Sequence, residues 1–147
     1  MAMKTGAPAG WSHFDHDADI GVRGTGPTLA TAFEQAALAL TGIITEEPVA
    51  AAQAVAITCA APDVETLFVD WLNALVFEMA TRQMLFGRYE VAIRQDGECA
   101  LEGQAWGERV DRERHRPTVE VKGATFTALS VWQDANGLWR AQCIVDV

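Results

Sequence analysis

Two stretches of the chain repeat apolar residues at the spacing of three or four that is typical of an amphipathic helix. The first follows Thr28, whose hydroxyl makes it a favourable N-cap, and we expect this helix to end at Gly42. The second opens at Pro62-Asp63 and carries the strongest helical signal in the chain. Its apolar side chains are expected to lie in the core, and they are Val64, Leu67, Phe68, Trp71, Leu72, Leu75, Val76 and Met79.

Elsewhere, apolar and polar residues alternate, which is the pattern of half-buried strands. Two dipeptides between such stretches, Asp96-Gly97 and Asn136-Gly137, are favoured two-residue hairpin turns. The acidic segment 15–23 is expected to be a loop that runs into a short strand. Further strands are predicted near residues 55–59, 89–93, 99–106, 119–132, with a bulge at Gly123, and 138–145.

These elements predict an α+β fold: a single domain with a mostly antiparallel or mixed β-sheet built from hairpins and two α-helices packed on one face. The domain is expected to span residues 14–147, after a loose lead-in of residues 1–13 that lacks the apolar region of a signal peptide. No run of about 18 apolar residues is present, so we expect no membrane contact and a cytoplasmic location. The isolated Cys59, Cys99 and Cys143 lie in apolar stretches and are expected to be reduced core thiols.

The net charge of −9 argues against a broad surface that neutralises nucleic-acid phosphates. Four of the eleven basic residues nevertheless lie in one short stretch, at Arg109, Arg112, Arg114 and Arg116. A local basic patch on an acidic protein suits a specific partner better than a polyanion. The stretch also alternates in sign, so a solvated loop with weak mutual ion pairs is the alternative interpretation.

The sharpest candidate for chemistry is the acidic segment Asp15-His16-Asp17-Ala18-Asp19. Its three carboxylates repel one another unless water or a cation screens them, and hard divalent cations prefer such oxygen ligands. An EF-hand is excluded, because Ile20 stands where that loop requires glycine and Gly26 where it requires glutamate. Asp146 and the chain-end carboxylate of Val147 are candidate further ligands, since a final strand can pair beside an N-terminal one. A solvated acidic loop is the alternative.

Other catalytic constellations have little support. His13 and His16 are three residues apart, which is weak support for zinc. The chain has only two serines, neither in a nucleophile-elbow context, and its glycines form no phosphate loop. Lys122 follows Glu120 by two residues in a predicted strand, so both side chains should share one face and form a surface ion pair.

Several segments together resemble the archease family. The element His16-Asp17-Ala18-Asp19-Ile20-Gly21 is similar to the family's His-Thr-Ala-Asp element, and residues 67–73 are similar to its acidic-aromatic helix. The run Asp111-Arg112-Glu113-Arg114-His115 resembles its Asp-Pro-Glu-Arg-His loop, residues 120–125 its Glu-Val-Lys strand, and residues 144–147 its ending. The order and spacing of these segments hold from about Phe14 onward. The departures are Asp17 for threonine, Arg112 for proline and Val147 for isoleucine.

This resemblance implies a small α+β protein that assists an RtcB-type RNA ligase, which joins RNA ends in tRNA splicing and RNA repair. The helper would promote guanylylation of the ligase from GTP, and so its turnover, without catalysis or direct stable RNA binding of its own. A calcium-like metal site is also implied, with Mg²⁺ as the alternative ion, at Asp19, Asp146, Val147, Asp15 and Asp17. The neighbouring functional surface would comprise Lys122, Glu120, Arg114, His115 and His16.

Two other functions stay open on the sequence alone. A metal-dependent hydrolase would use the acidic segment, but no residue stands out as its general base. A general chaperone or interaction module would fit the layout of helices and strands, but no exposed apolar run supports it. A pull-down with a candidate ligase would discriminate between these functions.

Overall fold

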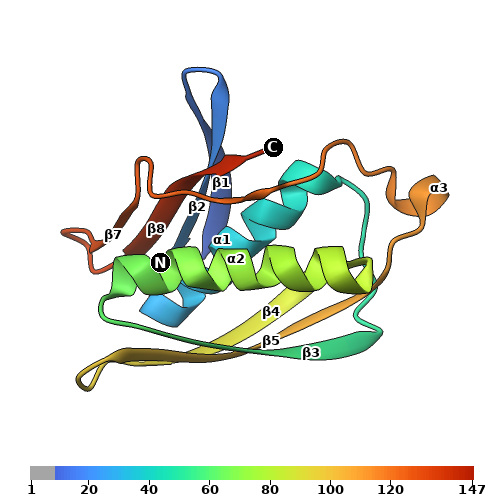
Figure 1. The fold of residues 1–147 in the computed structure, drawn as a ribbon. Helices are drawn as coiled ribbons and strands as arrows, with labels where there is room; N and C mark the ends of the chain where they lie inside the picture. The colour runs from blue at the N-terminus through green and yellow to red at the C-terminus, as the bar shows by residue number, and fades with distance from the viewer. Residues whose placement is uncertain (1–8) are drawn as a thin grey trace, which may run out of the picture.

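The computed structural model describes residues 9–147, which form two antiparallel sheets and two long helices (Figure 1). The larger sheet has the strand order β1-β2-β8-β6, with β7 also paired to β8, and the smaller sheet has the order β3-β5-β4. The elements are β1 (Gly10–His16), β2 (Asp19–Gly26), α1 (Leu29–Ile44), β3 (Gln53–Ala61), α2 (Val64–Arg82), β4 (Met84–Arg94), β5 (Cys99–Arg109), α3 (Arg112–His115), β6 (Gly123–Ala124), β7 (Ser130–Gln133) and β8 (Trp139–Asp146).

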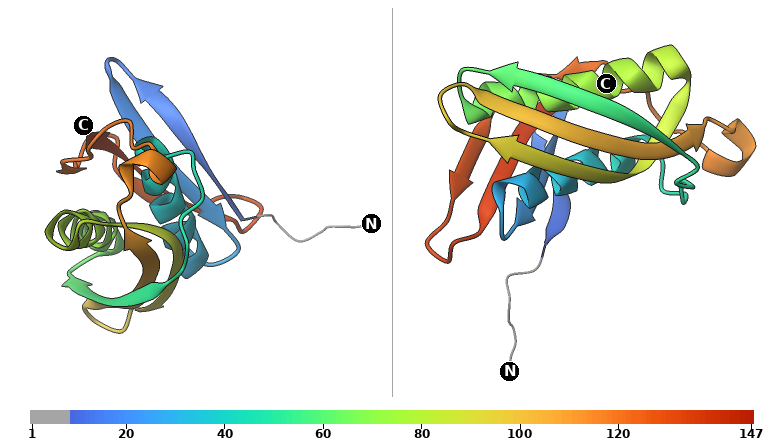
Figure 2. Two further views of the ribbon diagram at one scale, coloured as in Figure 1. Left: turned by 90° about the vertical axis from the view of Figure 1, so that its right-hand side faces the viewer. Right: turned by 90° about the horizontal axis from the view of Figure 1, so that it is seen from below.

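The expected α+β class is confirmed, but the strands form two sheets rather than one sheet with both helices on one face. Helix α1 contacts β2 of the larger sheet and β4 of the smaller one, whereas α2 packs mainly on the smaller sheet and against β6 and β7 (Figure 2). The reason is the composition of α1, which is apolar nearly all round. Such a helix needs apolar partners on more than one side.

The β1–β2 hairpin replaces two features expected from the sequence. Strand β1 begins at Gly10, inside the predicted lead-in of residues 1–13, because it pairs with β2 along its whole length. The segment 15–23 was expected as a loop that runs into a short strand. The short strand is confirmed in β2, but residues 15 and 16 belong to β1, and only residues 17 and 18 form the turn. The remainder of the lead-in, residues 1–8, lies outside the described residues.

Both long helices begin where the sequence predicts. The side chains of Thr28 and Asp63 accept hydrogen bonds from the backbone N–H groups three residues later, as N-caps do. Helix α1 continues past Gly42 to Ile44, so the expected end was wrong; the missing side chain of Gly42 instead leaves room for the ring of Trp11. In the part of the chain that is described, no helix has the length and apolar character needed to cross a bilayer.

Residues 119–132 were expected to form one long strand, and this prediction was wrong. Only β6 and β7 are strands there, because the segment meets β8 at separated points. Thr125 donates its N–H to the carbonyl oxygen of Ile144, and Ala128 then turns the chain with a φ of 53°. The hairpins predicted at Asp96-Gly97 and Asn136-Gly137 are confirmed, with φ of 80° at Gly97 and 86° at Gly137. Their loops are longer than the expected two residues, because residues 95–98 and 134–138 lie between the paired strands.

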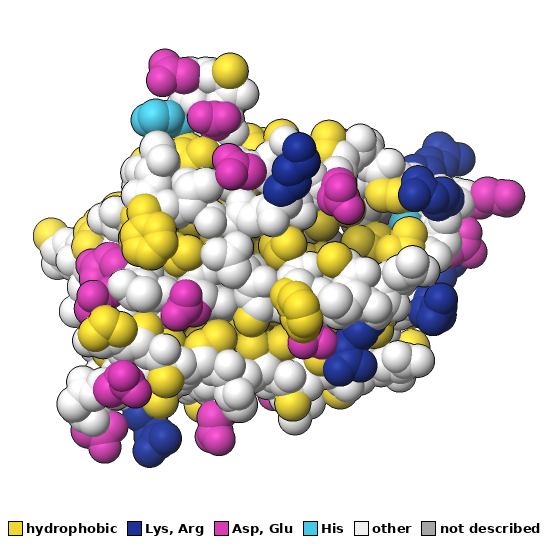
Figure 3. Space-filling model, in the orientation of Figure 1, with side chains coloured by type: hydrophobic (Ala, Val, Ile, Leu, Met, Phe, Trp, Pro, Cys, Tyr) yellow, Lys and Arg dark blue, Asp and Glu magenta, His cyan; other side chains and the backbone are white. Residues whose placement is uncertain are grey.

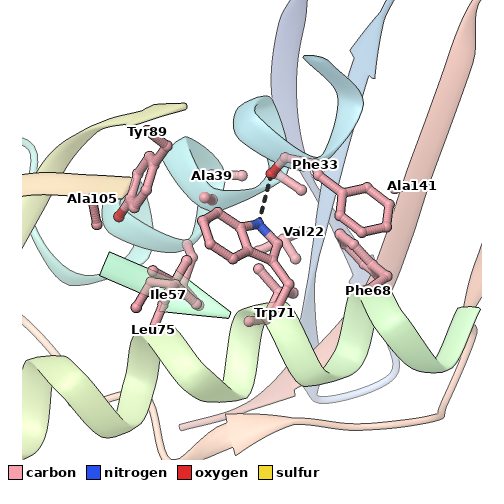
Figure 4. Packing of buried hydrophobic residues seen from close by; sticks show 14 of the residues in the cluster. Val22, Phe33, Ala39, Ile57, Phe68, Trp71, Leu75, Tyr89, Ala105 and Ala141 are labelled. Atoms are coloured by element: carbon pink, nitrogen blue, oxygen red, sulfur yellow. Dashed lines mark hydrogen bonds between the residues drawn. The ribbon is translucent and has the colours of Figure 1, made fainter. Parts of the chain in front are cut away.

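The core lies where α1, α2 and both sheets meet (Figure 4). Trp71 of α2 is fully buried, and its indole N–H donates to the carbonyl oxygen of Phe33 on α1 over 3.1 Å. The three cysteines are free thiols, as expected, and they are buried or half-buried. Burial raises the pKa of Cys59 to about 11 and that of Cys143 to about 12, so both are unreactive near neutral pH.

Candidate functional site

The strand register aligns polar residues from the two ends of the chain across the larger sheet. His16 of β1 pairs with Asp19 of β2, and Ile20 pairs with Val145 of β8, which places Asp19 opposite Asp146. Cross-strand partners point to the same face of a sheet. His16, Asp19 and Asp146 therefore share one face, and all three side chains are exposed. The sequence predicted that the acidic segment 15–19 and the C-terminus would meet, but it did not predict which side chains would share a face.

The other acidic residues of the segment are placed differently. Asp15 pairs with Ile20, so strand alternation directs it to the face opposite Asp19. Asp17 lies in the turn between β1 and β2 with a φ of 55°, and its side chain is 93% exposed. Its carboxylate is 4.0 Å from Nδ1 of His16, which is a weak, solvated contact. The structure thus groups Asp19 with Asp146 and separates Asp15 and Asp17 from them.

The carboxylates alone do not enclose a cation. Within residues 9–147, no three side chains of His, Cys, Asp or Glu converge as a metal-binding group. Asp19 and Asp146 offer oxygen donors on adjacent strands, and Val147 directly follows Asp146. Mg²⁺ is often held by one or two carboxylates together with water and phosphate oxygens, whereas Ca²⁺ takes six to eight oxygens. Two carboxylates are only part of the shell that a hard divalent cation requires, so main-chain oxygens, water or a partner molecule would have to supply the rest. Figure 3 shows acidic and histidine side chains gathered at the projecting end of the hairpin.

Lys122 is fixed to the acidic end through its backbone. Its N–H donates to the carbonyl oxygen of Asp146 over 2.8 Å, immediately before β6 pairs with β8. The expected ion pair between Lys122 and Glu120 does not form among the described residues, and both side chains are exposed. The reason is that residues 119–122 are not a strand, so strict side-chain alternation does not apply there.

His115 has a structural role that the sequence did not reveal. Its side chain is fully buried, and Nδ1 accepts the backbone N–H of Asp111 over 2.9 Å. Because Nδ1 is an acceptor, the proton of the neutral ring lies on Nε2, which donates to Oε2 of Glu108 over 2.9 Å. His115 therefore holds α3 against the end of β5 instead of lying on the predicted functional surface.

Glu108 is the centre of this network, and no pattern in the sequence singled it out. Arg114 donates two hydrogen bonds to its carboxylate, of 2.8 and 2.6 Å, and the backbone N–H of Ala50 donates a third of 2.7 Å. These donors, with Arg114 the strongest, hold the pKa of Glu108 well below its usual range. Arg114 was predicted as a surface contact, and the structure commits its guanidinium to Glu108 and, more loosely, to Asp111.

The fold and the row of polar residues define an α+β protein with an acidic sheet end, and comparisons with known proteins identify its family. Residues 11–147 match the Archease protein family. Protein archease of Pyrococcus furiosus is 37% identical over 139 residues, which is 93% of this chain and 98% of that protein. Protein archease of Aeropyrum pernix is 33% identical over 141 residues, 94% of this chain and 97% of that protein. The chain belongs to the archease family.

A solved structure agrees with this assignment. The solution structure of Methanobacterium thermoautotrophicum protein 1598 superimposes with a TM-score of 0.76 at 32% sequence identity. It covers 94% of this chain, which in turn spans 99% of that structure. The predicted family and α+β fold are thus both confirmed.

Proposed function

We propose that this protein is a non-enzymatic, cytoplasmic activator of an RtcB-type RNA ligase in tRNA splicing and RNA repair. It promotes guanylylation of the ligase and thereby its multiple turnover. Membership of the archease family supports this choice of partner. The observation that carries the proposal is the meeting of Asp19, Asp146 and Lys122 at one end of the larger sheet, from three distant parts of the chain.

The chemistry of this end suits a site where a nucleotide and metal ions must be gathered. Asp19 and Asp146 supply anionic oxygens for a divalent cation, with Ca²⁺ as the expected ion and Mg²⁺ as the alternative. When bound, the cation supplies positive charge that neutralises phosphate oxygens. Lys122, whose backbone N–H is bonded to Asp146, supplies an exposed ammonium group at the same end of the sheet. All three groups are accessible, so they can enter a partner's site and stabilise its competent arrangement.

The test is the rate of covalent labelling of a purified RtcB-type ligase from the same organism by labelled GTP. Addition of this protein is expected to accelerate labelling, and Asp19→Ala and Asp146→Ala are expected to remove most of the acceleration. Asp96→Ala, which changes an exposed aspartate in the β4–β5 turn, is the matched control and should behave as wild type. GTP hydrolysis by the protein alone, lost in Asp19→Ala, would instead support the metal-dependent hydrolase.

A further inference from the structure

A pocket of about 300 Å³ lies between the C-terminal half of α2 and residues 117–121, and the proposed activity does not use it. Its buried lining is apolar and comprises Ile44, Met79, Met84, Leu85 and Val121. Its volume is at the lower end of the range for ligand pockets. It therefore suits one or two apolar side chains better than a whole cofactor.

The mouth of the pocket is open to solvent. Val119 lines it with 41% of its surface exposed, although a valine in a folded protein is usually buried. Phe77, one residue from the pocket-lining Val76 on α2, is 61% exposed. Exposed apolar side chains beside an apolar pocket are typical of a site that another protein covers.

Basic residues flank this mouth and have no anionic partner within residues 9–147. Arg112 lines the pocket, Arg116 precedes its Pro117, and Lys122 follows its Val121. Arg109 is the cross-strand partner of Met84, another lining residue. By contrast, the arginines that form ion pairs in the described chain are Arg82, Arg88, Arg114 and Arg140.

The free cations stand out because the whole chain has a net charge of −9. Figure 3 shows dark blue Lys and Arg side chains gathered around the right-hand half of the face, with apolar side chains recessed between them. Glu120 is the acidic residue of the pocket lining, and the exposed Asp111 and Glu113 alternate with the arginines in the adjoining segment 109–116. A cationic rim around an apolar hollow is complementary to an acidic segment that carries a large apolar side chain.

We propose that this pocket is the docking site for such a segment of the partner protein, one that inserts an apolar side chain and places carboxylates against Arg109, Arg112 and Arg116. The proposal rests on the proposed function, since the partner is then the ligase. An RNA strand fits less well, because its phosphates would leave the apolar lining uncovered and the net charge would repel it. Docking here would bring Lys122 and its neighbour Asp146 to the ligase, because the backbone of Lys122 joins the two regions.

The test measures the rate of ligase guanylylation at increasing concentrations of this protein. The concentration for half-maximal stimulation reports docking, and the maximal stimulation reports the action of the acidic end. Arg112→Glu and Val119→Asp alter the rim and the mouth, and both positions are exposed. Their matched controls are Arg94→Glu, at an exposed arginine that forms no ion pair among the described residues, and Ala56→Asp, at an exposed position of β3. Melting temperatures near that of the wild type establish that each variant is folded.

Arg112→Glu and Val119→Asp are expected to raise the concentration for half-maximal stimulation by about ten-fold or more, the size of a typical interface hot spot. Maximal stimulation should be retained, because Asp19, Asp146 and Lys122 are intact. If Arg112→Glu and Val119→Asp need the same concentration for half-maximal stimulation as their controls, the docking proposal is wrong, and the proposed function stands. This holds even if the two variants change RNA binding or self-association. Absence of any stimulation by the wild type would instead overturn the proposed function.

Discussion

The backbone N–H of Lys122 donates a 2.8 Å hydrogen bond to the carbonyl oxygen of Asp146. Residues 24 positions apart in the sequence are thereby held together by main-chain atoms, and their side chains stay free in solvent. The side chains of Lys122 and Asp146 can therefore be replaced without loss of the main-chain hydrogen bond that holds the two residues together. The predictions for the acidic end depend on this.

Replacement of Lys122 by alanine is expected to remove most of the stimulation of the ligase and to leave the fold intact. An exposed side chain without partners in the described structure changes the free energy of unfolding by no more than about 0.5 kcal/mol. Urea denaturation and the guanylylation assay, made on the same preparation, measure the two effects. Arg94→Ala, the loss of another exposed cation, should leave both unchanged. A Lys122→Ala protein that stimulates normally would remove Lys122 from the functional surface.

Binding of Ca²⁺ at Asp19 and Asp146 is expected to raise Tm in proportion to the logarithm of the metal concentration, because the unfolded chain lacks the site. At one hundred times Kd the stabilisation is about 2.7 kcal/mol, which corresponds to roughly 5–10 °C for a domain of this size. Thermal melts with Ca²⁺ and then Mg²⁺ measure the shift. Asp19→Ala and Asp146→Ala should lose it, and Asp96→Ala should keep it. Equal shifts in all variants would place the ion elsewhere.

The sequence allowed prediction of those parts of the fold that local chemistry determines. Thr28 and Asp63 cap helices and Gly97 and Gly137 turn hairpins, because each acts on its own backbone neighbours. The second sheet could not be predicted, because it depends on how α1 distributes its apolar surface among distant strands. The role of Gly42 could not be predicted either, because the room that its missing side chain leaves is filled by Trp11, a residue far away in the sequence.

Truncation of Trp71 to alanine is expected to lower the free energy of unfolding by about 3–5 kcal/mol, as for other large buried aromatics. The side chain is fully buried, and its loss would also leave the carbonyl oxygen of Phe33 without the 3.1 Å hydrogen bond from the indole. Urea denaturation measures the change. The exposed Phe77 of the same helix is the control, and Phe77→Ala should cost far less.

The network around Glu108 is expected to make stability depend on pH. Its pKa is lowered in the folded protein, chiefly by Arg114, so the unfolded state binds a proton more readily. The stabilisation is then fully present above the unfolded pKa of about 4.3 and is lost progressively as pH falls below it.

Glu108→Gln should therefore be less stable than wild type by a constant amount between pH 6 and 8, and the difference should narrow below about pH 4.3. Guanidinium denaturation at several pH values measures it. The control is Glu102→Gln, at an exposed glutamate of β5 without an ion pair in residues 9–147. A difference that does not vary with pH would show that the charge of Glu108 contributes nothing.

The parts of the candidate site that lie in family motifs at the two ends of the chain could be predicted from the sequence. The residues whose role depends on whether they are buried could not. The acidic segment and Asp146 were expected to meet, and the register of β2 and β8 places Asp19 opposite Asp146. His115 was expected on the functional surface because of the resemblance of residues 111–115 to a family loop, and it is buried because Glu108 and the N–H of Asp111 satisfy both ring nitrogens. That pairing depends on the geometry of α3 after β5, which residue spacing does not reveal.

The measurement that tests the central proposal most directly is a multiple-turnover RNA ligation assay with limiting RtcB-type ligase from the same organism. With the wild-type protein added, product is expected to exceed the amount of ligase many times over. With Asp19→Ala, Asp146→Ala or Lys122→Ala, product should stay near the single-turnover level, and the folded Asp96→Ala control should restore turnover. A wild-type protein that gives no more product than buffer alone would contradict the account.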